Sequence, residues 1–255
     1  MKRDALGDRM KRYENATRDF LMPRSYTIMR IDGKAFHTFT KGLEKPLDKR
    51  IEDGMIGAMA ALFEKIQGVK YAYTQSDEIS LIITDFDTFE TQPWFGGNVQ
   101  KMTSVSASIA ANGFNKSWLY DAFIKGSMNM LNYDKIPWAE FDSRVFQLPN
   151  KNEVINYLIW RQQDAIRNSI SSSAQALFSP NKLHGMNQIQ MKEMLKSEGV
   201  IWDELPIAQQ RGIGFYKWID DIGEGMVRHV SQPDFSIPIF SENREYLEKL
   251  IPDYI

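Results

Sequence analysis

The stretch VKYAYTQSDEISLIIT (residues 69–84) decides the fold. It holds two runs rich in apolar, β-branched and aromatic residues, 69–75 and 78–84, which are separated only by Ser76 and Asp77. Two such runs joined by two turn-forming residues predict a β-hairpin. Upstream, SYTIMRI (25–31) predicts a strand that stops at Asp32-Gly33. Between that strand and the hairpin, residues 48–67 place apolar side chains at helical spacing behind a capping Asp48, which predicts a helix.

Further along the chain, residues 98–117 predict a second helix and PWAEFDSRVFQL (137–148) predicts a fourth strand. The order strand, helix, strand, strand, helix, strand is the split βαβ pattern of the ferredoxin-like fold, which is an α+β fold with an antiparallel sheet. A right-handed crossover makes the first two strands parallel, and the third strand inserts between them. The end of the first strand then lies beside the start of the third, so we expect Asp32 to neighbour Asp77 and Glu78.

The segments around this unit predict additional helices and a C-terminal extension. Residues 4–21 have apolar positions three to four apart and precede Pro23, which predicts an amphipathic helix. Residues 152–178 and 186–198 predict two more helices, and GIGFYKW (212–218) is a candidate extra strand. From Asp220 onward the tail is interrupted by prolines and gives no clear pattern. We divide the chain into a catalytic domain at 1–148, which includes the N-terminal helix, and a helical and mixed region at 149–255 packed on it as one compact unit.

Composition excludes several classes of protein. The chain of 255 residues has 43% hydrophobic and 25% charged residues, as ordinary globular proteins do. It has no cysteine, which excludes disulfides, thiol catalysis and Cys-ligated zinc, and only three well-separated histidines. No apolar run reaches the ~18 residues of a membrane span, and MKRDALGDRMKR (1–12) is too charged for a signal peptide. We therefore expect a cytoplasmic protein without membrane partners.

The charge distribution is uneven although the net charge is only −2. Residues 1–50 hold 13 Lys and Arg against 7 Asp and Glu, a local charge of +6. The net charge argues against non-specific coating of nucleic acid, while the basic N-terminal part could face phosphates. A solvated helix face explains the same charges equally well.

The expected meeting of Asp32 and Asp77 is the pattern that carries chemistry. Two carboxylates at one sheet edge require a cation between them, and hard oxygen ligands favour Mg²⁺ completed by substrate phosphates. Gly33 could offer its carbonyl, and successive N–H groups of DGKAFH (32–37) could cradle a triphosphate. Lys34 and Lys45 could add positive charge. Taken singly, each acid is more typical of a turn, and His37 of packing or capping. The residues alone thus indicate a candidate for metal-dependent phosphoryl transfer.

Several motifs in one order resemble a known family. RIDGKAFHTFTKGLEKPLD (30–48), YTQSDEISL (73–81) and WRQQDAIRNSI (160–170) resemble the tRNA(His) guanylyltransferase family, whose members carry I-D-G-[RK]-x-F-H, K-P-x-D, Q-S-D-E and W-R-Q-x-D. The resemblance covers roughly residues 1–218. It implies a ferredoxin-like polymerase palm in the catalytic domain and an enzyme that extends RNA in the 3′-to-5′ direction.

The resemblance also implies roles for individual residues. Asp32, the Gly33 carbonyl and Asp77 would bind two Mg²⁺ ions, with Asp32 and Asp77 catalytic and Glu78 a candidate additional acid. Asp32, Gly33 and Asp77 would also contact the nucleotide, together with Lys34, Ala35, Phe36, His37, Lys45 and Ser76. Ala35 stands where many relatives have glycine. Arg161, Arg167 and Asn168 are candidates for RNA binding, although a solvated helix face is the more common role of such arginines. The implied partners are tRNA, ATP, GTP or other nucleoside triphosphates, and three further copies in a homotetramer.

In the implied reaction, ATP adenylylates the RNA 5′ end, or that end already carries a triphosphate. The 3′-hydroxyl of an incoming nucleotide then attacks the 5′ phosphorus and expels AMP or pyrophosphate. Residues 166–172 read IRNSISS where eukaryotic members have His-Ile-Asn-Asn-Leu-Tyr-Asn, so the chain resembles the bacterial and archaeal guanylyltransferase-like branch, which favours templated repair of 5′-truncated tRNA. Three alternatives stay open: guanosine addition to tRNA(His), a palm-type nucleotidyl cyclase, and a non-catalytic tRNA-binding protein.

Overall fold

The computed structural model describes residues 4–124, 138–223 and 226–254, and its centre is one antiparallel sheet. The strand order is β4-β1-β3-β2-β5-β6, and each neighbouring pair is antiparallel. Because β3 lies between β1 and β2 and is antiparallel to both, β1 and β2 are parallel. The expected α+β fold with a split βαβ core is confirmed. The strands are β1 Tyr26–Gly33, β2 Val69–Gln75, β3 Glu78–Ile83, β4 Phe141–Leu148, β5 Ile213–Gly223 and β6 Met226–Asp234.

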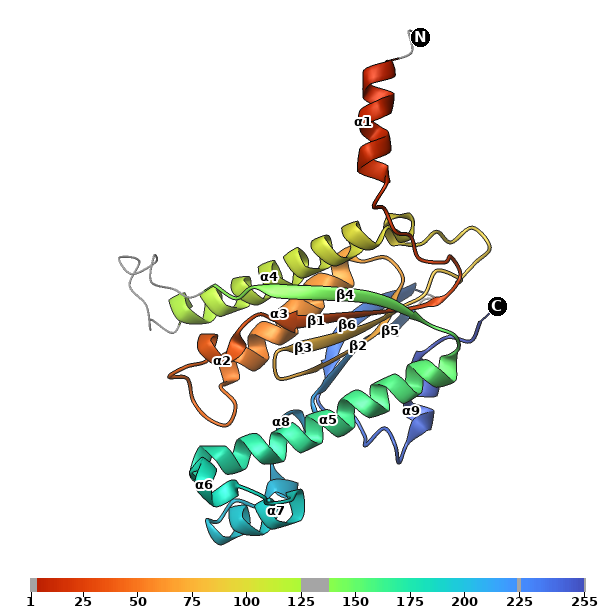
Figure 1. The fold of residues 1–255 in the computed structure, drawn as a ribbon. Helices are drawn as coiled ribbons and strands as arrows, with labels where there is room; N and C mark the ends of the chain where they lie inside the picture. The colour runs from red at the N-terminus through yellow and green to blue at the C-terminus, as the bar shows by residue number, and fades with distance from the viewer. Residues whose placement is uncertain (1–3, 125–137, 224–225, 255) are drawn as a thin grey trace.

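Two helices cover one face of the sheet, namely α3 (Lys49–Lys65) and α4 (Val99–Ile124) (Figure 1). Their apolar stripes form the larger core with side chains of β1, β2 and β3. As expected, Asp48 caps α3, and its side chain accepts a hydrogen bond from the Arg50 N–H. The two helices cross closely, since a Cβ on Gly113 would lie 2.6 Å from the carbonyl oxygen of Gly57. The second helix is longer than the expected 98–117.

The opposite face of the sheet is covered by α5 (Lys151–Leu177) and α9 (Arg244–Leu250) (Figure 1). The buried Gln162 of α5 ties the chain before α9 to this face, because it donates to the Pro238 carbonyl and accepts from the Phe240 N–H. The last turns of α5 leave the sheet and form a small separate core. That core involves α6 (Pro180–Leu183), α7 (Gln188–Ser197) and the 3₁₀ turn Trp202–Glu204, and α8 (Ile207–Arg211) then leads into β5.

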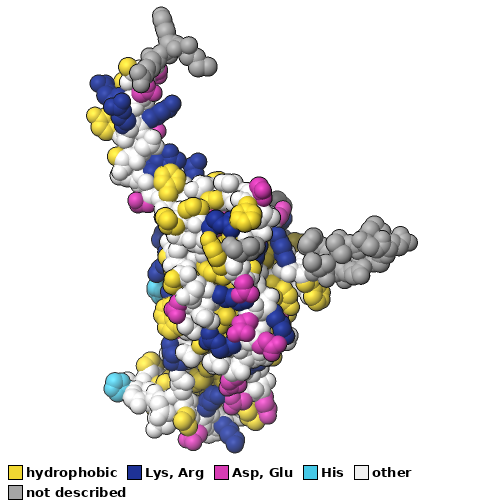
Figure 2. All heavy atoms as spheres, turned by 90° about the vertical axis from the view of Figure 1, so that its right-hand side faces the viewer, with side chains coloured by type: hydrophobic (Ala, Val, Ile, Leu, Met, Phe, Trp, Pro, Cys, Tyr) yellow, Lys and Arg dark blue, Asp and Glu magenta, His cyan; other side chains and the backbone are white. Residues whose placement is uncertain are grey.

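The N-terminal helix differs from the expectation. Helix α1 runs from Ala5 to Asn15, not to residue 21, and stands away from the body with no buried residue (Figures 1 and 2). It ends early because the following segment pairs with the start of α4. The Leu21 N–H donates to the Gly97 carbonyl, and the Val99 N–H donates to the Asp19 carbonyl. These tertiary hydrogen bonds replace the helical ones that the sequence pattern predicts.

The C-terminal tail also differs from the expectation, because it contains a strand that the sequence pattern did not indicate. Strand β6 pairs with β5 at the edge of the sheet, where Pro233 is tolerated since an edge strand leaves one side unpaired. The expected strand at 137–148 begins only at Phe141, and residue 137 lies outside the described residues. No helix in the described part of the chain is long and apolar enough to cross a membrane.

Candidate active site

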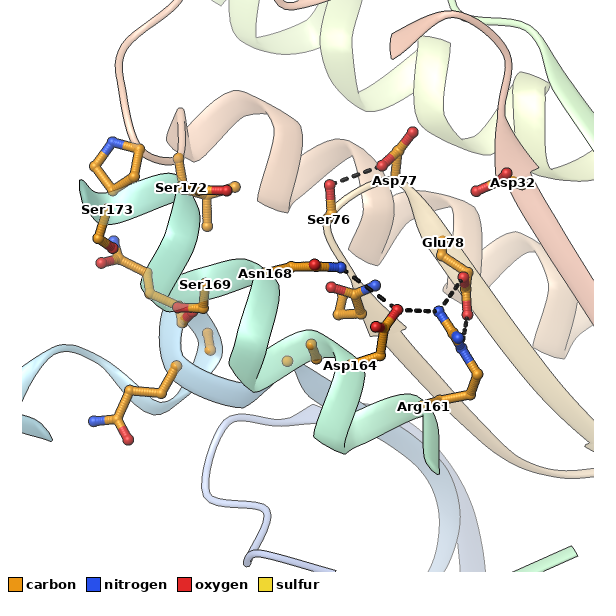
Figure 3. Close-up of a pocket in the computed structure, with 18 of the residues that line it drawn as sticks. Asp32, Ser76, Asp77, Glu78, Arg161, Asp164, Asn168, Ser169, Ser172 and Ser173 are labelled. Atoms are coloured by element: carbon orange, nitrogen blue, oxygen red, sulfur yellow. Dashed lines mark hydrogen bonds and ion pairs between the residues drawn. The ribbon is translucent and has the colours of Figure 1, made fainter. Parts of the chain in front are cut away.

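The ends of β1 and β3 bring the two predicted acids together. Asp32 lies directly opposite Glu78 in the β1–β3 register, and the Gly33 N–H donates to the Asp77 carbonyl oxygen at 3.0 Å. Figure 3 shows the Asp32 and Asp77 side chains beside the same cavity, one from the end of β1 and the other from the hairpin turn. Residues 45 positions apart in sequence are therefore neighbours at one sheet edge, as the fold predicts.

The surroundings of Asp32 raise its pKa. Partial burial raises the pKa of Asp32, and the nearby charges of Asp77, Glu78 and Asp142 raise it further, while Arg30 lowers it. The Asp77 carboxylate is oriented by Ser76, whose hydroxyl donates to Asp77 Oδ1 at 2.7 Å. Like charges held this close disfavour ionisation unless positive charge enters between them.

The donor set fits Mg²⁺. Within residues 4–124, 138–223 and 226–254, no group of three or more His, Asp or Glu side chains is arranged to hold a metal ion. The available ligands are instead two carboxylates, of Asp32 and Asp77, and the Gly33 carbonyl. Mg²⁺ is commonly bound by one or two carboxylates with substrate phosphates and water filling the remaining positions, so this incomplete set suits it.

Residues 33 and 35–37 form one wall of a cavity beside Asp77, whereas Lys34 does not line it. Its volume is about 460 Å³, and the lining includes Gly33, Ala35, Phe36, His37, Lys45, Ser76 and Asp77. Ala35 has a φ of 54° and caps the short helix α2 (Phe36–Phe39), whose first N–H groups have no acceptor within the helix. Such a turn presents N–H groups to an anion. The left-handed φ of Ala35 is a conformation that favours glycine.

The side chains of this wall have different surroundings. Phe36 is buried against Phe114 and Phe141, so only its backbone is available to a ligand. The Phe36 ring also explains why residue 33 is a glycine, because a Cβ on Gly33 would lie 2.3 Å from that ring. Lys34 is exposed and pairs with Glu140 at 2.6 Å. His37 is exposed, with Nε2 3.0 Å from the Thr38 hydroxyl, and Lys45 is exposed as well.

A second cavity of about 430 Å³ lies on the other side of the hairpin turn. Asp32, Ser76 and Asp77 border it on the sheet side, and α5 lines it with polar side chains (Figure 3). These include Asp164, Asn168, Ser169, Ser172 and Ser173. Ser76 and Asp77 belong to both cavities, so the hairpin turn separates a space lined by residues 33 and 35–37 from a space lined by α5.

The residues expected to contact RNA do not share one environment. Arg167 is half exposed and pairs with Asp164, and Asn168 is exposed. Arg161 is only 3% exposed, and its Nε and Nη2 donate to the buried carboxylate of Glu78 at 2.6 and 2.7 Å. Arg161 is therefore engaged inside the protein, and its expected role in RNA binding stays a prediction. Glu78 likewise has both oxygens occupied by arginines.

Two participants in this arrangement were missed by the sequence reasoning. Arg30 pairs with Glu78 at 2.5 Å, and Asp164 accepts from both Arg161 and Arg167. An arginine in the otherwise apolar strand 26–31 was the available signal for Arg30, since a charge facing a covered sheet side needs a partner. For Asp164 the signal was its place in the WRQQD motif.

Comparisons with known proteins agree with this geometry. The sequence profile of the family described as tRNAHis guanylyltransferase matches residues 7–149, more than half of the chain. The chain belongs to the tRNA(His) guanylyltransferase family. It is accordingly a nucleotidyltransferase, as expected from its motifs.

Individual members of the tRNA(His) guanylyltransferase family show how far the likeness extends. A bacterial tRNA(His) guanylyltransferase-like protein, solved in complex with ATP, is 42% identical, and the match covers 97% of this chain and 99% of that chain with a TM-score of 0.82. Its complex with GTP gives a TM-score of 0.79 at the same identity and coverage. The probable tRNA(His) guanylyltransferase of Drosophila melanogaster is 26% identical over 250 residues, which are 92% of this chain and 82% of the fly protein.

Proposed function

We propose that this protein adds nucleotides to the 5′ end of tRNA in the 3′-to-5′ direction, with Mg²⁺, and that it repairs 5′-truncated tRNA under Watson–Crick direction. The observation that carries the proposal is the meeting of Asp32 and Asp77 at the ends of neighbouring strands, where Asp77 lines both the cavity that Asp32 borders and the cavity beside residues 33 and 35–37. Transfer of a nucleotidyl group requires carboxylates that bind cations and, beside them, N–H groups that bind phosphates.

Different residues of the site bind the nucleotide and the metal ions. The backbone of 35–37 and the side chain of Lys45 hold the phosphates of the nucleotide, whereas the Lys34 N–H already donates to the Glu140 carbonyl. Ser76 contacts the nucleotide while orienting Asp77. Asp32, Asp77 and the Gly33 carbonyl hold the Mg²⁺ ions, which supply charge stabilisation for the attacking and leaving oxygens. The 3′-hydroxyl of the incoming nucleotide loses its proton as it attacks the 5′ phosphorus of the RNA, and AMP or pyrophosphate leaves.

The preference for templated repair rests on the α5 side of the site. Residues 166–172 lie on α5, and Asn168 and Ser172 face the cavity that begins at Asp32. This stretch departs from the eukaryotic motif, and the bacterial guanylyltransferase-like structures match the chain over 97% of its length. Guanosine addition to tRNA(His) is a second candidate, favoured by relatives such as the fly protein, which is named as a probable tRNA(His) guanylyltransferase.

A primer-extension experiment at the 5′ end tests the proposal. The protein is incubated with Mg²⁺, ATP and a labelled nucleotide, using tRNA transcripts that lack one 5′ nucleotide and differ only in the opposing base. The proposal expects lengthening only with the complementary nucleotide. Addition of guanosine whatever the opposing base would favour the second candidate. A cyclic nucleotide product, or binding without any product, would overturn the proposal.

We also propose a homotetramer, and the feature that supports it is α1. Its Leu6, Met10 and Tyr13 are 60%, 42% and 68% exposed and recur at helical spacing. A helix of 11 residues is marginal in water without packing partners, so a second copy of the chain would stabilise it. Light scattering at micromolar concentration measures the mass. We expect four times 29.5 kDa for the wild type and a smaller assembly for Leu6→Asp.

A further inference from the structure

We propose that Glu78 is a positioning residue: with Arg161 and Arg30 it clamps the catalytic hairpin to α5 so that Asp77 faces Asp32, and it takes no place among the metal ligands. This inference rests on the proposed use of Asp32 and Asp77 as metal ligands. It concerns two residues that the sequence assigned elsewhere, one to acid chemistry and the other to RNA.

The contacts of Glu78 leave it no free oxygen for a metal ion. Arg161 donates from Nε to Oε1 and from Nη2 to Oε2, which is the planar two-bond arrangement that arginine forms with carboxylates. Arg30 Nη2 lies 2.5 Å from Oε2 on the sheet side. Glu78 itself is 5% exposed. A carboxylate that accepts two guanidinium groups away from solvent would have to give up strong bonds before it could bind a cation.

The group around Glu78 has more positive than negative charges. Arg161 Nη2 also donates to Asp164 at 3.1 Å, and Asp164 pairs with Arg167, so three arginines face the two carboxylates of Glu78 and Asp164. The two arginines bound to Glu78 offset part of its charge next to Asp77 and opposite Asp32. Among these acids, Asp32 and Asp77 have no arginine of the described residues bound to their carboxylates, and Asp142 lies opposite Asp32 on β4.

The clamp acts where the position of Asp77 is set. The Glu78 carbonyl accepts from the Thr74 hydroxyl at 2.8 Å, and the Asp77 carbonyl accepts from the Gly33 N–H at 3.0 Å. The turn between these bonds is short and Ser76 in it has a positive φ of 51°. Without the arginines, the buried Glu78 would be driven toward water, and the turn that carries Asp77 would move with it.

Two substitutions separate the positioning role from direct ligation. Arg161→Gln keeps the Glu78 carboxylate but frees its Oε1, while Arg30 stays on Oε2. Glu78→Gln keeps the shape of the side chain but removes its charge. If Glu78 positions Asp77, both variants weaken Mn²⁺ binding in the presence of ATP by about tenfold, as loss of a ligand-orienting partner does, and the double variant is little worse than either. If Glu78 were a ligand, Glu78→Gln would weaken binding while Arg161→Gln would leave it unchanged or tighten it, which would overturn the proposal.

A conservative variant and a matched control guard against simple unfolding. Arg161→Lys keeps the charge but cannot span both oxygens of Glu78, so we expect its Mn²⁺ affinity to lie between that of the wild type and that of Arg161→Gln. A Lys variant equal to wild type would show that charge alone suffices and would refute the clamp. Gln162→Leu removes two equally buried hydrogen bonds on the same helix but none to the hairpin, so Mn²⁺ binding should stay within twofold. An equal loss in this control would also overturn the proposal.

A second readout needs neither metal nor nucleotide. Amide hydrogen exchange in peptides that cover 31–34 and 74–79 reports the opening of the hairpin. We expect at least tenfold faster exchange there in Glu78→Gln and Arg161→Gln, and none of this acceleration in Gln162→Leu. Unchanged exchange in the first two variants would overturn the clamp. If the wild-type protein bound neither Mn²⁺ nor ATP, that result would count against the proposed function. The exchange data would still show whether Glu78 holds the hairpin in place.

Discussion

Replacing Asp48 by Asn should destabilise the protein by about 2 kcal/mol at pH 7, and the loss should depend on pH. Asp48 is 6% exposed, and its two oxygens accept from the Arg50 guanidinium at 2.9 and 2.7 Å. The Arg50 side chain, followed by the N–H groups of Arg50 and Glu44, lowers the pKa of Asp48 from 3.8 to about 2. Each tenfold change in proton affinity is worth about 1.4 kcal/mol, which gives the size of the effect.

Asparagine isolates the charge because it resembles a protonated aspartate in shape. It is also an equally good helix cap, so the hydrogen bond to the Arg50 N–H at the start of α3 can persist. A carboxylate with a lowered pKa stabilises the folded state above its unfolded pKa, and this stability is lost as pH falls through the folded pKa. The difference between wild type and variant should therefore be full at pH 7 and shrink to roughly half at pH 3.

Urea unfolding of both proteins at pH 7, 4 and 3 measures this difference. Asp4→Asn is the matched control, because Asp4 caps the exposed helix α1 through one hydrogen bond to the Gly7 N–H and lies next to no buried residue of that helix. We expect the control substitution to lower the free energy of unfolding by less than about 0.5 kcal/mol. Two results would refute the assigned role of the Asp48 charge. One is a loss of unfolding free energy in Asp48→Asn at pH 7 that is no larger than in the control, and the other is a loss at pH 3 that equals the loss at pH 7.

Three further outcomes follow from the site and the core. Asp77→Asn should slow 5′ addition by about a hundredfold or more while tRNA retention in a filter assay stays within twofold; near-normal turnover would remove Asp77 from the mechanism. Removal of divalent ions with EDTA should stop addition, and Mg²⁺ or Mn²⁺ should restore it; turnover in EDTA would count against the donor set assigned to Asp32 and Asp77. Gly113→Ala should lower the free energy of unfolding by about 1–3 kcal/mol, because the added methyl meets the Gly57 carbonyl at 2.6 Å. Asn112→Ala, at the exposed neighbouring position, should lose no stability in the same denaturation assay. Equal losses of stability in the two variants would contradict the close helix contact.

Local patterns in the sequence determined the central unit of the fold. The hairpin around Ser76-Asp77, the strand before Asp32 and the Asp48 cap of α3 follow from turn chemistry and residue periodicity, which act over a few neighbouring residues. Because the split βαβ order permits few arrangements, these elements also placed Asp32 beside Asp77 and Glu78. The roles of those acids, and the boundary at residue 148, stay predictions.

Only the tertiary structure decided how the polar side chains around the site are used. Arg161 has the sequence context of a solvated helix residue, yet a carboxylate 83 positions away holds it in the interior. The early end of α1 has a similar cause, since hydrogen bonds of residues 19–21 to the start of α4, about 80 positions away, outweigh local helix preference. Periodicity shows which face of an element is apolar, but the partner of a charge is fixed only when the elements pack.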